Sequence, residues 1–98
     1  MVRSPRLEIA LANGLDVVLG LEPSLTLDVP PGWSLRQLFE HLAAAVHPWF
    51  GRLAADPRAG HGRVMVVYND RSLRLPDDLD VSVGGGGELW LLLPMMGG

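Results

Sequence analysis

One stretch in the middle of the chain constrains the fold more than any other. Ser34 and Gln37 have the spacing of a capping box, in which each side chain satisfies a free backbone N–H at the start of a helix. Apolar residues then recur at helical spacing and form one stripe: Leu35, Leu38, Phe39, Leu42 and Val46. Pro48 ends the helix, because the residue before a proline is pushed out of the helical region. A helix over residues 34–46 therefore needs one apolar surface to cover.

Segments with strand patterns lie on both sides of this helix. Apolar and polar residues alternate over 6–12 and again over 24–29, which predicts two half-buried strands in a hairpin-like pair. Residues 63–68 form a nearly continuous apolar run, which is typical of a strand covered on both faces. A short edge strand over 72–75 and a last apolar strand over 89–93 follow. The other segments are a candidate short helix, a loop and a stretch of ambiguous state: 49–55, 56–62 and 15–21.

The order of these elements predicts an α+β fold. The 98 residues make a single domain, 1–98, that ends in a diglycine tail over 94–98. The helix has a stripe wide enough to cover one face of a small mixed sheet. With the helix as a crossover, we expect strand 63–68 to run parallel to a neighbour. This arrangement is a β-grasp roll, in which four or five strands pack on one main helix.

Composition excludes several classes of chemistry. The chain has no cysteine, so it can form no disulfide, thiolate metal site or thiol nucleophile. Its eight basic residues are all arginine and are scattered, and the net charge is −3, which argues against nucleic-acid binding. No apolar run approaches the roughly 20 residues that span a bilayer. We therefore expect a cytoplasmic protein with no nucleic-acid or membrane partner.

The usual residues of metal and catalytic sites are present but poorly spaced: His41, His47 and His61, and Asp77, Asp78 and Asp80. His41 and His47 lie off the i, i+4 spacing of two ligands on one helical face. Turn chemistry explains the three aspartates better than a metal site does. The glycine run 84–87 leads into a strand and has no lysine, unlike a phosphate-binding loop. We expect no bound metal or cofactor and no enzyme activity of its own.

The last predicted strand is apolar on both faces. Alternate residues point to opposite sides, so the helix can cover only one of two sets: Leu89, Leu91 and Leu93, or Trp90 and Leu92. An exposed apolar patch ordinarily marks an interaction site, and tryptophan is enriched among hot spots. We therefore interpret Trp90 and Leu92 as partner-binding residues. In the alternative, the segment 15–21 or Trp33 folds over them.

The sequence ends in Pro94-Met95-Met96-Gly97-Gly98. Pro94 cannot donate to a strand ladder, so pairing should stop there. The two glycines have no Cβ and fit where any side chain would clash. We expect Gly97 and Gly98 to form a thin, bendable thread, the Gly98 carboxylate to be the functional group, and Pro94, Met95 and Met96 to contact a partner. A frayed terminus is the plainer alternative.

Three motifs within residues 24–98 carry a resemblance: Pro-Pro-Gly-x-Ser-Leu-x-x-Leu at 30–38, the strand and Asn turn at 64–69, and Gly87-Glu88-Leu89 with the Pro-x-x-Gly-Gly ending. Together they resemble the ubiquitin-like sulfur carriers, above all the small subunit of molybdopterin synthase. The resemblance implies that an activating enzyme uses ATP to adenylate the Gly98 carboxylate. A sulfur donor then makes a thiocarboxylate, which delivers sulfur to the large synthase subunit or another sulfur-accepting enzyme. The carrier would be a protein co-substrate.

Other functions fit the same sequence. A ubiquitin-like modifier would also be adenylated at Gly98 before its conjugation to lysines of target proteins, so the tail does not separate the two functions. The lack of lysine rules out only lysine-linked chains of the protein itself. A carrier for another sulfur-containing metabolite fits as well. A β-grasp interaction module without terminal chemistry is the third class.

Overall fold

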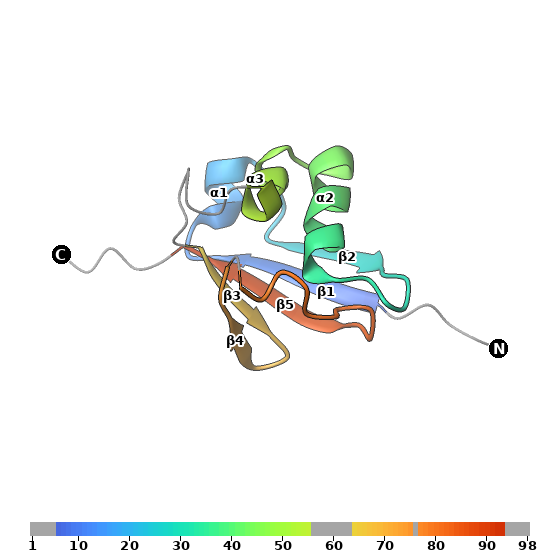
Figure 1. Ribbon diagram of the computed structural model, residues 1–98. Helices are drawn as coiled ribbons and strands as arrows, with labels where there is room; N and C mark the ends of the chain where they lie inside the picture. Colours follow the sequence, from blue (N-terminus) through green and yellow to red (C-terminus); the bar gives the residue numbers. More distant parts are fainter. Residues whose placement is uncertain (1–5, 56–63, 76, 94–98) are drawn as a thin grey trace.

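The computed structural model describes residues 6–55, 64–75 and 77–93. In chain order the elements are β1 (Arg6–Ala12), α1 (Leu15–Leu19), β2 (Ser24–Asp28), α2 (Leu35–Ala45), α3 (Trp49–Ala55), β3 (Met65–Tyr68), β4 (Arg71–Leu73) and β5 (Gly87–Leu92). The five strands form one sheet in the order β2-β1-β5-β3-β4. In the described part of the chain, the three helices lie over the same face of this sheet (Figure 1).

Helix α2 begins as the sequence predicts. The Ser34 side chain accepts a hydrogen bond from the Gln37 backbone N–H at 3.2 Å, and the Gln37 side chain accepts one from the Ser34 N–H at 2.9 Å. The capping box is therefore confirmed. Its apolar stripe faces the sheet and is buried, except at the last position, where Val46 follows the helix and is 37% exposed.

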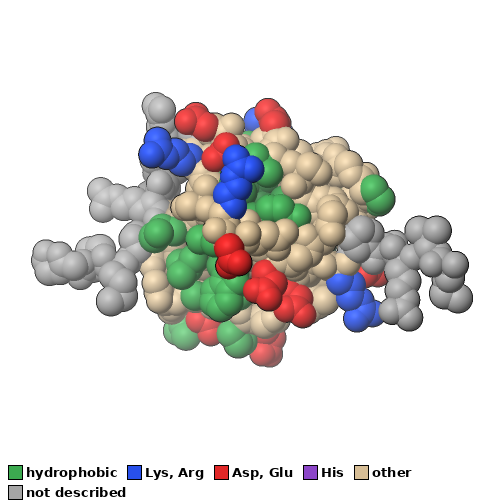
Figure 2. Space-filling view, turned by 90° about the horizontal axis from the view of Figure 1, so that it is seen from below, with side chains coloured by type: hydrophobic (Ala, Val, Ile, Leu, Met, Phe, Trp, Pro, Cys, Tyr) green, Lys and Arg blue, Asp and Glu red, His purple; other side chains and the backbone are tan. Residues whose placement is uncertain are grey.

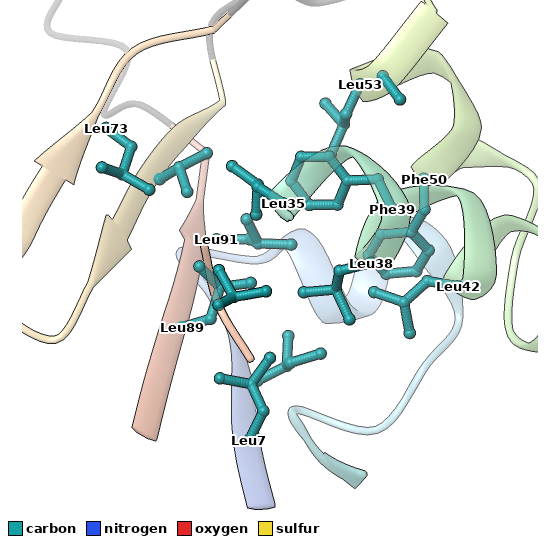
Figure 3. Close-up of a cluster of buried hydrophobic side chains, with 14 of the residues drawn as sticks. Leu7, Leu35, Leu38, Phe39, Leu42, Phe50, Leu53, Leu73, Leu89 and Leu91 are labelled. Atoms are coloured by element: carbon teal, nitrogen blue, oxygen red, sulfur yellow. The ribbon is translucent and has the colours of Figure 1, made fainter. Parts of the chain in front are cut away.

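The core lies between this stripe and the sheet (Figure 3). Leu7 and Ile9 of β1 and Leu89 and Leu91 of β5 are completely buried beneath the helices. Two phenylalanines fill the space above them, Phe39 from α2 and Phe50 from α3, and both are also fully buried. Full burial of one such side chain contributes about 1.5–3 kcal/mol. The central strands are thus held to the helices by contacts that only alternate residues make.

Two expectations about the strands are wrong. The strand after the helices, β3, runs antiparallel to both neighbours, β4 and β5, and the parallel pair is β1 with β5. Strand β5 takes the central place between β1 and β3, so the crossover does not bring β3 beside β1. Residues 63–68 are not covered on both faces either: Met65 is 49% exposed, because the helices cover one face of the sheet.

The connections agree with their sequence signals where the structure describes them. The ambiguous segment 15–21 contains α1, and the candidate helix over 49–55 is α3. Asn69 and Asp70 have positive φ angles of 48° and 67° and form the two-residue turn between β3 and β4. Asp78 accepts a hydrogen bond from the Arg74 N–H at 2.7 Å, as its predicted turn role requires. The loop expected over 56–62 lies outside the described residues.

Candidate functional site

The face of the sheet opposite the helices, here called the open face, carries an apolar patch across three strands. Trp90 of β5 pairs with Ala10 of β1 and Val67 of β3. Two residues further along β5, Leu92 pairs with Ala12 of β1 and Met65 of β3. Paired residues of neighbouring strands point to the same side of a sheet. The apolar patch therefore consists of Ala10, Ala12, Met65, Val67, Trp90 and Leu92.

The patch is exposed although β5 is the central strand. Trp90 is 42% and Met65 49% exposed, whereas Leu89 and Leu91, on the other side of β5, are fully buried. The predicted division of the strand is confirmed for Leu89, Leu91 and Trp90, whereas Leu92 is half-buried. The proposed cover is absent: α1 lies on the helical side (Figure 1), and the Trp33 ring packs against His41 of α2, with 5.3 Å between ring centroids.

Carboxylates border the patch at the start of β5. Glu8 and Glu88 are direct partners in the β1–β5 register, on the open face, and both are exposed. The Trp90 indole N–H lies 3.5 Å from the Glu88 Oε2 atom. Figure 2, which views the molecule from below, shows hydrophobic side chains gathered in one area beside Asp and Glu side chains. The site thus combines an apolar centre with a negatively charged border.

The start of β5 is fixed by the turn before β4. The Asn69 N–H donates to the Glu88 carbonyl at 2.9 Å, and the Glu88 N–H donates to the Asn69 side-chain oxygen at the same distance. The Tyr68 hydroxyl also donates to the Gly86 carbonyl at 2.7 Å. These bonds hold the strand in the register that aligns Trp90 with Val67. They give the Asn turn in the sequence a defined task, which is to set the position of the patch.

At its other end, β5 leads toward the predicted reacting residues. Leu93 is the last described residue, and its carbonyl accepts a hydrogen bond of 2.9 Å from the side-chain amide of Asn13. Five predicted site residues lie outside the described residues: Pro94, Met95, Met96, Gly97 and Gly98. Their roles stay predictions, as do the partner-binding roles of Trp90 and Leu92. The structure does place the root of the tail at the edge of the apolar patch.

Sequence reasoning missed part of this site. Ala10, Ala12, Met65 and Val67 join the patch only because their strands flank β5 in register. Each is apolar at an alternate strand position, but that signal acquires a meaning only once the strand order is known. The contact between Asn13 and Leu93 joins residues 80 positions apart, so no local pattern could show it.

The described residues offer little for other kinds of site. Over the ranges 6–55, 64–75 and 77–93, no group of three or more His, Asp or Glu side chains is placed to hold a metal ion. The His47 Nδ1 atom accepts a hydrogen bond from the Trp49 N–H at 3.0 Å, next to the start of α3, and His61 lies outside these ranges. No helix of the described part is long and apolar enough to cross a membrane.

Comparison with known proteins finds solved structures with a similar fold. No family model matches the sequence, and no curated protein matches it. Among solved structures, SAMP1 (small archaeal modifier protein 1) from Haloferax volcanii has a TM-score of 0.68 and 24% identity, over 95% of this chain and 99% of that one. SAMP1 from Methanosarcina acetivorans has a TM-score of 0.64 and 18% identity, over 99% and 100%.

A third similar structure has a name that refers to molybdopterin instead of a modifier protein. It is a Pyrococcus furiosus protein with the tentative name molybdopterin converting factor, subunit 1; its TM-score is 0.65 and its identity 18%, over 93% of this chain and 99% of that one. All three are small proteins that this chain matches over nearly their whole length. The predicted α+β class with a β-grasp roll is confirmed, and the likeness to ubiquitin-like sulfur carriers is confirmed at the level of the fold.

Proposed function

We propose that this protein is a sulfur carrier whose Gly98 carboxylate is converted into a thiocarboxylate, and that it serves molybdopterin synthesis. The observation that supports the proposal most is a juxtaposition: the root of a Pro-x-x-Gly-Gly tail lies beside an exposed apolar patch on a β-grasp sheet. In the first step, a carboxylate oxygen attacks the α-phosphorus of ATP in the activating enzyme, and pyrophosphate leaves. Hydrosulfide released by a sulfur donor then attacks the acyl carbon, the acyl–phosphate bond breaks and AMP leaves, so that a thiocarboxylate remains.

In this proposal, the apolar patch supplies binding free energy that the two glycines of the tail cannot supply. Gly97 and Gly98 have no side chains to bury, so a tail of this kind gains little binding free energy in a narrow active site. Buried apolar surface contributes about 25 cal/mol per Å², and Trp90 and Met65 together offer the largest exposed apolar side chains of the patch. Binding energy gained away from the reacting group can hold that group in place. In this proposal, the patch docks and the tail reacts.

The carboxylate border defines the chemistry of the partner. Glu8 and Glu88 face each other on the open face, so a docked partner that places an Arg or Lys side chain there relieves the repulsion between them. Charge complementarity of this kind raises the rate of association and sets the register of docking. The activating enzyme and the sulfur-accepting enzyme would both need the patch and the tail. They would therefore bind this protein in turn.

Intact mass spectrometry tests the central step. The protein alone should have the mass of a chain that ends at Gly98. After co-expression with its activating enzyme and a sulfur donor, one oxygen should be replaced by sulfur. A variant with one alanine added after Gly98 is the matched control, because it leaves the domain unchanged and moves the carboxylate. Persistence of an unmodified carboxylate under all such conditions would overturn the proposal.

A second function is favoured by the neighbours themselves, two of which are named as small modifier proteins. As a modifier, this protein would be joined through Gly98 to lysines of other proteins. Blots of a tagged protein in cell lysate separate the two functions. A ladder of larger species that disappears on deletion of Gly98 indicates conjugation, whereas a single band that carries a thiocarboxylate indicates sulfur transfer alone.

A further inference from the structure

We propose that Asn13 is a positioning residue that anchors the root of the tail and so sets where the Gly98 carboxylate can reach. The relevance of this anchor to catalysis rests on the proposed function, but the anchor itself does not. Its basis is the hydrogen bond of 2.9 Å from the Asn13 side-chain amide to the Leu93 carbonyl. In the described part of the chain, this is the hydrogen bond nearest to the tail.

The register explains why a side chain makes this bond. The parallel pairing of β1 with β5 ends at Ala12 and Leu92. A continuing strand would offer its next backbone N–H to the Leu93 carbonyl. The chain instead turns away, because Asn13 and Gly14 both have positive φ angles, 57° and 86°, and α1 begins at Leu15. The Asn13 amide takes the place of the missing ladder N–H and extends the pairing by one step.

Asparagine meets two requirements at this position. The left-handed backbone conformation is tolerated by glycine and, among residues with side chains, best by Asn and Asp. A donor to a carbonyl is the second requirement, and only the amide of Asn provides one, since an ionised Asp accepts only and Gly has no side chain. The turn alone would be satisfied by any of the three residues. The hydrogen bond is what makes Asn specific.

The anchor matters because Gly98 lies only five residues beyond Leu93. A stretch of that length spans at most about 18 Å. The position and direction of the root therefore decide which points above the apolar patch the carboxylate can reach. Strand β3 holds the end of β5 on one side, and β1 with Asn13 holds it on the other. Because the root can then take fewer positions, the Gly98 carboxylate can reach fewer points. Better orientation of a reacting group raises the rate of its reaction.

Two substitutions remove the donor without disturbing the turn. N13G keeps the left-handed conformation and has no side chain, while N13D keeps the side-chain shape but has no donor when ionised. N69G is the matched control: Asn69 is also left-handed, with φ 48°, and its side chain also bonds β5, but at the opposite end of the strand. All three variants remove one side-chain hydrogen bond to the same strand.

The first measurement uses the free full-length protein. In 15N–1H NMR spectra, the Leu93 amide signal should shift and its heteronuclear NOE should fall in N13G and N13D, but not in N69G. The second measurement is the rate of thiocarboxylate formation with the activating enzyme. We expect kcat to fall about two- to tenfold in N13G and N13D, the loss typical of one exposed hydrogen bond, with KM for the carrier unchanged.

The outcomes separate the anchor from the proposed function. An unchanged Leu93 signal in N13G and N13D overturns the anchor, whatever the rates are. A Leu93 signal that changes as much in N69G as in N13G also overturns the positioning role, because it would indicate a general effect of a weakened β5. If the wild-type protein forms no thiocarboxylate while the Leu93 signal responds to Asn13, the proposed function fails and the anchor stands.

Discussion

The two faces of β5 are both apolar, yet they differ in what covers them. Leu89 and Leu91 are fully buried beneath α2 and α3, whereas Trp90, which lies between them in the sequence, is 42% exposed. A central strand with one covered face can hold the core with one set of side chains and offer the other set to a partner. Hydrophobicity alone does not distinguish these roles; the placement of the helices does. Substitutions at neighbouring positions of β5 should therefore have effects of different kinds.

The largest expected effect comes from truncation on the helical side. Leu91→Ala removes a fully buried side chain and should lower the free energy of unfolding by about 2–5 kcal/mol, because a cavity remains in the core. Leu92→Ala is the matched change on the open face, where the side chain is half-buried, and should lower it by about 1 kcal/mol. Urea denaturation of both variants gives the comparison. Equal losses of unfolding free energy in the two variants would contradict the conclusion that only the helical side of β5 holds the core.

Truncation of the tryptophan on the open face should act on binding. Trp90→Ala should weaken affinity for the activating enzyme by about 2 kcal/mol, or about 30-fold in Kd, as for a hot-spot residue. Its effect on the free energy of unfolding should stay within about 1 kcal/mol. Titration calorimetry measures the first quantity and thermal denaturation the second. Trp33→Ala, on the helical side against His41, is the control and should leave affinity unchanged. An unchanged Kd for Trp90→Ala would remove the patch from the docking site.

The smallest effect is expected at the carboxylate border. Glu8→Gln removes one of two like charges that face each other across β1 and β5, and should raise the free energy of unfolding by about 0.2–1 kcal/mol. It should also slow association with the activating enzyme and reduce the salt dependence of that rate. Glu40→Gln, on the exposed side of α2, removes the same charge far from the patch. A variant at Glu8 that is less stable than this control would contradict the interpretation.

Local signals were sufficient for most of the elements. The capping box at Ser34 and the stripe behind it predict α2 to within a residue at each end, because both depend on neighbours within a few positions. The alternation over 6–12 predicts β1 for the same reason. Strand pairing is different, since it joins distant segments. The parallel partner of β1 is β5, about 80 residues later, and the pattern of β3 could not show which of its faces would stay open.

By itself, the sequence determined most of the helices and strands and the two-faced character of the last strand. These follow from the spacing of apolar residues, from proline and glycine chemistry and from the order of residues along the chain. The tertiary structure alone decided that β5 is central, that Met65 and Val67 extend the patch around Trp90, and that Asn13 reaches the Leu93 carbonyl. Those features depend on which strands meet and in what register, and that choice is made by the burial of the whole apolar surface at once.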